Sequence, residues 1–168
     1  MENTKLNRKR VFVLVGPAGV GKSTWAIRQM EPETDIMISR DNIRFMMLKN
    51  DEPYFAVEDK VRKAFFEAIE KYTSEEEYEN IYIDATHLVP KSRAQVLRRI
   101  KGDAERIAVS FEAPVQVAIE RNKNRIGRAL VPESVIYNMK DNFIIPSIKE
   151  GFDEIWHVDA DGKTIKEF

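Results

Sequence analysis

The chain contains no cysteine and no long apolar segment. Without cysteine it has neither a disulfide framework nor thiolate chemistry, which is compatible with a reducing compartment. No stretch approaches the roughly 20 apolar residues that a membrane-spanning helix needs. The charged N-terminal segment 1–10 is not followed by a signal-peptide cleavage pattern. We therefore expect a cytoplasmic protein.

A large net charge is also missing. With 27 basic and 28 acidic residues the formal charge is −1, which argues against a protein that coats long nucleic acid by charge alone but leaves room for a local basic site. The 168 residues, 43% hydrophobic and 33% charged, fit one globular domain with its own core. We see no internal repeat, linker or low-complexity tract, so the expected domain is 1–168.

Apolar runs alternate along the chain with helical patterns, which predicts an α/β domain with a mostly parallel sheet. The run at 10–16 is unbroken and ends in glycine, as expected of a strand buried on both faces. The expected strands are 10–16, 34–39, 80–86, 106–112 and 154–160. The expected helices are 23–30, 41–78 with a break near Pro53, 90–102 with Pro90 in its first turn, 114–125 and 132–143.

The segment "GPAGVGKST" (16–24) follows the first strand and precedes a helix, and it satisfies G-x-x-x-x-G-K-[ST]. Glycines let such a loop curl so that its backbone N–H groups and the positive helix end face phosphate oxygens. Lys22 can reach the β- and γ-phosphates, and Ser23 offers a hydroxyl to Mg²⁺. The sequence thus predicts a nucleotide-triphosphate site formed by Gly16, Gly19, Val20, Gly21, Lys22, Ser23 and Thr24.

Other motifs exclude two classes of nucleotide enzyme. A GTPase would need an Asn-Lys-x-Asp segment, but in "RNKNR" (121–125) the Asp position holds Arg125. The third strand ends in Asp84 without the Asp-x-x-Gly of a GTPase switch. ATPase motors are larger and carry an acidic pair after their second motif. A short phosphate-loop chain of five strands instead favours a small phosphotransferase.

Such an enzyme needs a cationic lid, and "ERNKNRIGRALVP" (120–132) is the candidate. Arg121 and Arg125 are four residues apart, so on a helix they share a face. Arg128 follows Gly127, a possible hinge. Guanidinium groups stabilise the charge that develops on a transferred phosphoryl group. The same residues on a solvated helix end would only complement the helix dipole.

The stretch "ISRDNIR" (38–44) ends the second strand and places Asp41 between two arginines. Asp41 is either the N-cap of a helix, with Arg44 as its i,i+3 partner, or the general base of an acceptor site. Standing after a phosphate loop and before an arginine lid, it favours the general base. Arg40 receives no role from the sequence.

These pieces, in this order, resemble the polynucleotide 5′-kinases, particularly the kinase module of phage and bacterial end-healing enzymes. The resemblance rests on residues 16–26, 39–44, 83–86, 120–125 and 131–139, and it extends over about 11–158. It implies an adenylate-kinase-like core, a five-stranded parallel sheet flanked by helices. It also implies transfer of the ATP γ-phosphate to a 5′-hydroxyl end of RNA or DNA, of which only the last nucleotides need be bound.

The resemblance implies roles residue by residue. Asp41 is the general base, and Arg44 holds the phosphate on the 3′ side of the acceptor nucleoside. Arg121 and Arg125 contact the ATP phosphates from the lid, and Asp84 belongs to the acceptor network. The chain departs from the family at Asn42, where a second acidic residue is frequent.

His87 is a further departure, because the family often has asparagine there. His87 is either an acceptor contact or a loop histidine near the surface. The basic residues Lys91, Arg93, Arg98, Arg99 and Lys101 are either a solvated helix face or a surface that steers the strand. "HVDADGKT" (157–164) matches a phosphatase motif only in part, and we interpret it as a turn before the terminal residues.

Two other functions stay open. A small-molecule kinase for a sugar, an antibiotic or a nucleoside would use the same phosphate loop, base and lid, without Arg44 as a phosphate ligand. A nucleotide-binding regulatory or toxin-like module would not turn over nucleic acid. Binding alone does not need a general base, so the combination of Lys22, Ser23, Asp41 and Arg125 argues against the second alternative.

Overall fold

The computed structural model describes residues 8–167, so Phe168 and most of the charged N-terminal segment lie outside the described residues. The strands are β1 (Arg10–Val15), β2 (Asp35–Ser39), β3 (Asn80–Asp84), β4 (Glu105–Phe111), β5 (Glu154–Val158) and β6 (Thr164–Glu167). The helices are α1 (Lys22–Gln29), α2 (Arg40–Met47), α3 (Glu58–Ser74), α4 (Pro90–Leu97), α5 (Val115–Asn122) and α6 (Glu133–Asn142). Short 3₁₀ turns cover Gly127–Ala129 and Ile148–Glu150.

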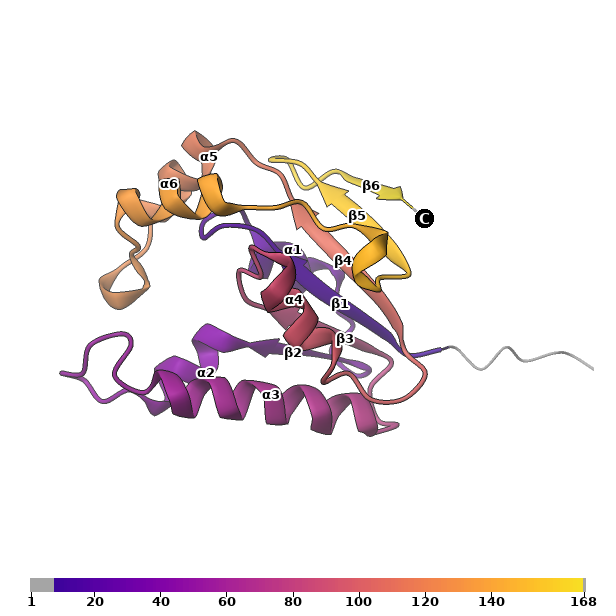
Figure 1. Cartoon of the computed structure of the whole chain (residues 1–168). Coiled ribbons are helices and arrows are strands. Elements are labelled where there is room, and N and C mark those ends of the chain that lie inside the picture. Colours follow the sequence, from indigo (N-terminus) through magenta and orange to yellow (C-terminus); the bar gives the residue numbers. More distant parts are fainter. Residues whose placement is uncertain (1–7, 168) are drawn as a thin grey trace, which may run out of the picture.

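The strands form one six-stranded sheet in the order β2-β3-β1-β4-β5-β6 (Figure 1). Strands β1 to β5 are parallel, which confirms the predicted α/β class. The predicted count of five strands is wrong, because β6 adds an antiparallel edge strand to β5. Its four residues, "TIKE", hold a single large apolar side chain, Ile165, so the sequence carried almost no strand pattern there. The turn expected at 157–164 does lead into this strand.

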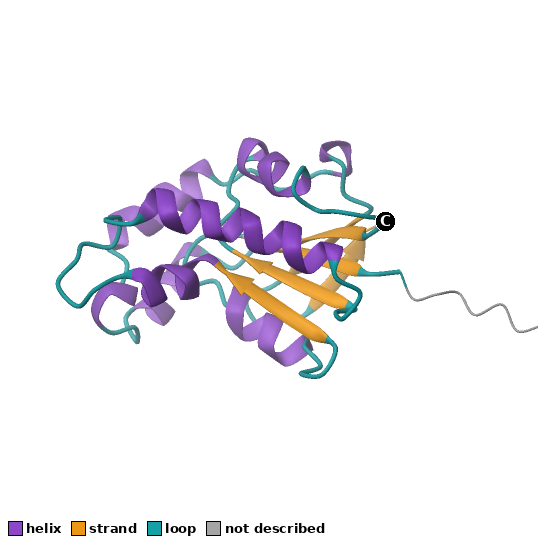
Figure 2. Cartoon of the chain, turned by 90° about the horizontal axis from the view of Figure 1, so that it is seen from below, coloured by secondary structure: helices purple, strands orange, loops and turns teal. Residues whose placement is uncertain are grey.

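Helices cover both faces of the sheet (Figure 2). Because side chains alternate along a strand, Val11 and Val13 enter one core layer and Phe12 and Leu14 the other. The first layer packs against α3 and α4 through residues such as Phe65 and Val96. The second packs against α1, α5 and α6, in which Trp25, Ala118, Ile119 and Ile136 are buried. Strands apolar on both faces therefore lie between two helical layers.

Local signals set where the helices begin. Ser39 is the N-cap of α2, and its hydroxyl accepts a hydrogen bond from the Asn42 N–H at 3.3 Å. The alternative of Asp41 as N-cap is therefore wrong, and Asp41 lies in the first turn of α2 instead. Pro90 occupies the first turn of α4, as predicted. The helical stretch expected from Asp41 onward does break around Pro53, between α2 and α3. Within residues 8–167, no helix combines the length and the apolar character that crossing a membrane requires.

Candidate active site

The predicted phosphate loop joins β1 to α1 and has the curled backbone that its glycines allow. Gly19 and Gly21 adopt left-handed φ values of 82° and 95°, which side-chain-bearing residues rarely adopt. A Cβ atom at Gly19 would lie 2.5 Å from the Ala118 carbonyl oxygen, so any larger residue would push the loop away from α5. The loop thus forms a narrow backbone concavity at the N-terminus of α1, which fits a nucleotide phosphate chain.

Lys22 lies at the first position of α1 and is buried under the loop. Its ammonium group donates to the carbonyl oxygens of Gly16 at 2.9 Å and Pro17 at 2.7 Å. Burial lowers the pKa of Lys22 to about 8, and the charge of Asp84 opposes that shift. Since this value lies above neutral pH, Lys22 stays mostly cationic and retains the charge needed for a phosphate.

Ser23 and Asp84 meet beside Lys22. The Ser23 hydroxyl donates to Asp84 Oδ2 at 2.6 Å, which joins the start of α1 to the end of β3. A hydroxyl next to a buried carboxylate is a set of oxygen ligands that suits Mg²⁺ bound with phosphates. The predicted pairing of a loop hydroxyl with Mg²⁺ therefore has a fitting donor set, to which Asp84 adds a carboxylate.

Asp41 projects from the first turn of α2 into the same region, and its side chain is 53% exposed. Its Oδ1 accepts hydrogen bonds from Arg44 Nη1, at 2.5 Å, and from the Tyr54 hydroxyl. Among the hydrogen bonds of the described residues, none ends on Oδ2. The carboxylate is thus held in one direction by two donors while one oxygen stays open to a ligand. An oxygen that is open to a ligand can accept a proton from a bound hydroxyl.

Arg44 is enclosed, with 4% of its side chain exposed. Besides Asp41 it pairs with Glu58 Oε2 at 2.6 Å, and its Cζ lies 4.1 Å from the centre of the Tyr54 ring. Glu58 also pairs with Arg40, which gives Arg40 the structural contact that the sequence left unassigned. Arg44 lines the cavity as predicted, but both of its terminal nitrogens already hold carboxylates.

His87 lies between β3 and α4 and is buried, so the expectation of a loop histidine near the surface is wrong. Its Nδ1 is 2.7 Å from the Leu14 carbonyl oxygen, and its ring faces the Phe65 ring with 6.2 Å between centres. Burial lowers the pKa of His87 to about 4, against the Leu14 hydrogen bond, with Lys22, Arg40 and Arg93 adding to the lowering. The side chain of His87 is therefore neutral at pH 7 where it lines the site.

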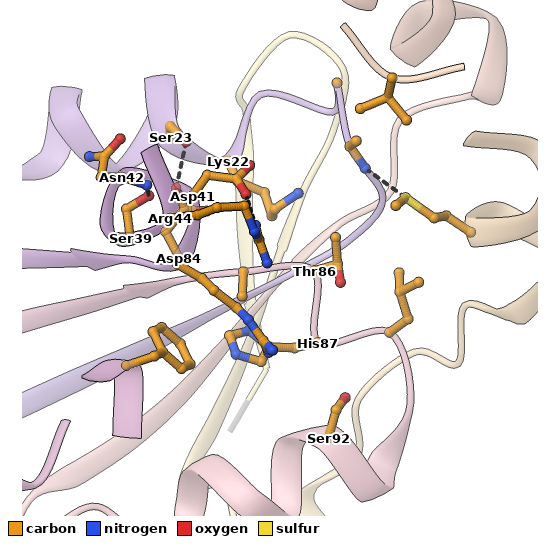
Figure 3. A pocket seen from close by; sticks show the side chains of 18 of the residues that line it. Lys22, Ser23, Ser39, Asp41, Asn42, Arg44, Asp84, Thr86, His87 and Ser92 are labelled. Carbon is orange, nitrogen blue, oxygen red and sulfur yellow. Dashed lines mark hydrogen bonds and ion pairs between the residues drawn. The ribbon is translucent and has the colours of Figure 1, made fainter. Parts of the chain in front are cut away.

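One cavity of about 630 Å³ brings most of the predicted residues together (Figure 3). It opens at the carboxyl ends of β1, β2 and β3, where parallel α/β sheets bind ligands. The predicted site residues that line it are Gly19, Gly21, Lys22, Ser23, Thr24, Asp41, Arg44, Asp84, His87 and Arg125. Gly16 lies behind the loop, where its N–H donates to the Thr86 carbonyl oxygen.

The two lid arginines do not share a helix face, so that prediction is wrong. Helix α5 ends at Asn122, and Arg125 lies in the turn beyond it, on the main cavity. Arg121 instead donates to the carbonyl oxygens of Val20 and Ala160 and lines a second cavity of about 300 Å³. Gly21 and Thr24 border both cavities, so Arg121 and Arg125 lie on different cavities beside the same loop.

Sequence reasoning missed three contributors. Tyr54 and Glu58 orient Asp41 and Arg44 from the loop after α2 and from α3, and their distance along the chain left no local pattern. Arg93 was assigned to a basic surface, but its side chain is 0% exposed and pairs with Glu150 at 2.7 Å. It also donates to the carbonyl oxygens of His87 and Ile144, and thereby fixes the loop that carries His87.

Comparison with known proteins bears on the family. A family model described as an AAA domain matches residues 11–146, well over half of the chain. The search of curated proteins finds no match. These results and the fold describe a P-loop, kinase-like domain.

Solved structures share the fold at low identity. A chain of the Pnkp1/Rnl/Hen1 RNA repair complex superposes with a TM-score of 0.68 at 23% identity, covering 98% of this chain and 50% of that one. A chain of the PezAT toxin-antitoxin system of Streptococcus pneumoniae gives 0.67 at 19% identity, covering 94% and 70%. A gluconokinase from Sinorhizobium meliloti 1021 gives 0.54 at 21% identity, covering 91% and 85%. The chain thus spans about half the length of the repair-complex chain.

Proposed function

Because the chain belongs to the AAA domain family and has a P-loop, kinase-like fold, we propose that it is an ATP-dependent polynucleotide 5′-hydroxyl kinase. It transfers the γ-phosphate of ATP to 5′-hydroxyl ends of RNA or DNA. The observation that carries the proposal is the carboxylate of Asp41, which shares a cavity with Lys22 and keeps one oxygen open. The structural likeness to a chain of an RNA repair complex supports it.

The proposed reaction assigns a step to each charged group. The acceptor oxygen bonds to the γ-phosphorus while the bond from that phosphorus to the β–γ bridging oxygen breaks, and ADP leaves. The hydroxyl proton passes to Asp41 Oδ2. Lys22 and Arg125 neutralise charge on the transferred group, and Arg121 holds the phosphate loop through the Val20 carbonyl oxygen. Mg²⁺ supplies further charge neutralisation when bound, and Ser23 beside Asp84 would hold it.

A small-molecule kinase is the second candidate, and the enclosure of Arg44 favours it. A polynucleotide kinase is expected to use Arg44 for the phosphate on the 3′ side of the acceptor nucleoside. Here Arg44 is paired with Asp41 and Glu58, so that phosphate would have to displace or share a carboxylate. A sugar acceptor would leave both pairs intact. The fold similarity to a gluconokinase is consistent with this candidate.

Transfer of radiolabelled γ-phosphate separates the two candidates. Acceptors would be 5′-hydroxyl RNA and DNA oligonucleotides, nucleosides with and without a 3′-phosphate, and a panel of sugars including gluconate. The proposal expects label on oligonucleotide ends and a higher kcat/KM for nucleosides that carry the 3′-phosphate. Label on sugars with none on any nucleic-acid end would replace it with the second candidate.

The role of Asp41 as general base is tested by a substitution of that residue. Asp41→Asn keeps the size of the side chain but accepts no proton, so we expect kcat to fall by about 10² to 10⁴. Binding of ATP, followed by fluorescence titration of a labelled nucleotide, should change little because Asp41 faces the acceptor side. Asp51→Asn, an exposed residue of the neighbouring loop, is the matched control. Full turnover by Asp41→Asn would remove Asp41 from catalysis.

A further inference from the structure

Three buried nitrogen atoms in the described residues have no hydrogen-bond partner, and all three belong to residues that line the main cavity. They are Nε of Arg40, Nε of Arg44 and Nε2 of His87. Buried polar atoms in native proteins are nearly always paired, so a group left unpaired at a cavity wall points to a ligand. The proposed reaction uses none of these atoms.

The His87 ring presents a lone pair at Nε2. The Leu14 carbonyl oxygen can only accept a hydrogen bond, so the proton of the neutral ring is on Nδ1, 2.7 Å away. Nε2 is consequently an acceptor. The residue is 5% exposed, and burial lowers its pKa to about 4, so the ring does not become a cation near neutral pH. An anionic phosphate oxygen would be repelled at this position.

Arg40 supplies a donor on the same part of the wall. One terminal nitrogen of its guanidinium pairs with Glu58 at 2.5 Å, while the Nε–H is buried without a partner. The Arg40 Cζ lies 5.8 Å from the centre of the Phe65 ring, and the His87 ring centre lies 6.2 Å from the same point. The unpaired donor of Arg40 and the unpaired acceptor of His87 thus belong to residues that both lie near Phe65, which also lines the cavity.

A hydroxyl group can pair with one donor and one acceptor, because it donates through its hydrogen and accepts through its oxygen. We propose that His87 Nε2 and the Arg40 Nε–H bind a second hydroxyl of the acceptor, the 2′-hydroxyl of the terminal ribose, so that RNA ends are preferred over DNA ends. This inference rests on the proposed polynucleotide kinase function and adds the class of nucleic acid. A deoxyribose fills the same space but leaves both buried atoms unpaired, which is the costly case.

Matched oligonucleotides test the preference. The enzyme would receive RNA, DNA, and RNA carrying one 2′-deoxy substitution at its 5′-terminal nucleotide, each with all four terminal bases. We expect kcat/KM for RNA to exceed that for DNA by about tenfold or more, and the single deoxy substitution to remove most of that advantage. The KM for ATP should be the same with every acceptor.

His87→Asn identifies the atom responsible. Asparagine tolerates the left-handed backbone of His87, whose φ is 46°, and its amide can still donate to the Leu14 carbonyl. It is too short to place an acceptor where Nε2 lies. The ratio of kcat/KM for RNA to that for DNA should therefore fall toward one. Arg40→Lys, which can still pair with Glu58, should lower the ratio as well, whereas Ser92→Ala on the same cavity wall should keep it.

The failures of the two proposals can be told apart. Absence of transfer to any nucleic-acid end overturns the proposed function itself. Equal kcat/KM for RNA and DNA, with transfer to both, overturns only the inference that His87 and Arg40 bind the 2′-hydroxyl. A preference that follows the terminal base rather than the sugar also overturns it, as does an unchanged RNA-to-DNA ratio in a folded His87→Asn protein.

Discussion

At the scale of single residues, Arg93 has a structural role: it holds together the segments beside the site. It is fully buried, pairs with Glu150 through two nitrogens, and donates to two backbone carbonyls from the loops that carry His87 and Ile144. We expect Arg93→Met to lower the free energy of unfolding by about 3 to 5 kcal/mol, because a carboxylate and two carbonyls lose their partner. Urea denaturation followed by tryptophan fluorescence measures it.

Two further variants sharpen that measurement. Arg98→Met removes an exposed arginine just beyond the end of the same helix and should change the stability by no more than about 0.5 kcal/mol. Arg93→Met combined with Glu150→Met should cost less than Arg93→Met alone, since no unpaired carboxylate stays behind. If Arg93→Met were as stable as the parent protein, the buried Arg93–Glu150 pair would contribute nothing to the free energy of unfolding.

Residue roles could be predicted where a side chain acts within a local motif. Lys22, Ser23 and Asp41 lie in the first turns of helices that follow strands β1 and β2, and the structure places all three on one cavity. The prediction that Arg93 lies on a basic surface was wrong, because it was based on the charge of the residue and not on its position in the helix. Yet Arg93, Val96 and Ile100 recur at spacings of three and four, which is the pattern of a buried helix face. Partners such as Glu58, far along the chain, leave no such pattern.

At the scale of elements, the predicted lid (120–132) and the loop after α2 face each other (Figure 1), and Arg128 connects them. Arg128 Nη1 donates to the carbonyl oxygens of Lys49 at 3.1 Å and Glu52 at 3.0 Å. We expect Arg128→Ala to release both segments, because these exposed hydrogen bonds join one loop to the other. Hydrogen–deuterium exchange should become faster in peptides covering 48–57 and 124–131.

The control for the predicted lid is Lys123→Ala, which removes an exposed cation whose one ion pair among the described residues is with Glu120 of the same segment. It should leave exchange in 48–57 unaltered. Exchange in α1 should not respond to either substitution, because in the described residues neither Lys123 nor Arg128 makes a hydrogen bond to that helix. Unchanged exchange at 48–57 in Arg128→Ala would mean that the two loops are held by other contacts.

Elements were predictable where apolar periodicity is long. The five parallel strands begin and end within two residues of their expected bounds, since each is an apolar run with polar or turn residues around it. The edge strand β6 has too few apolar residues to be predicted from the sequence. It is held by its pairing with β5, and Lys166 Nζ lies 4.2 Å from the centre of the Trp156 ring. The end of α5 before Arg125 was missed because basic residues continue past it without a stop signal.

At the scale of the whole molecule, burying His87 neutral makes stability depend on pH. The histidine pKa is 6.5 as the reference value and about 4 in the folded protein, where burial is the main cause. Between those values the unfolded chain binds a proton that the folded protein does not, so stability falls as the pH decreases from about 6.5 to about 4. Fully developed, that loss amounts to roughly 3 kcal/mol.

Comparing the parent protein with His87→Asn isolates this contribution, because the carboxylates and His157 titrate in both. Urea denaturation at pH 7.5, 5.5 and 4.5 should show that the stability difference between the two proteins shrinks or reverses toward low pH. The reason is that asparagine has no proton to gain on unfolding. A difference that stays constant over this range would mean that His87 is protonated equally in the folded and unfolded states. The neutral Nε2 acceptor, on which recognition of a hydroxyl depends, would then be absent.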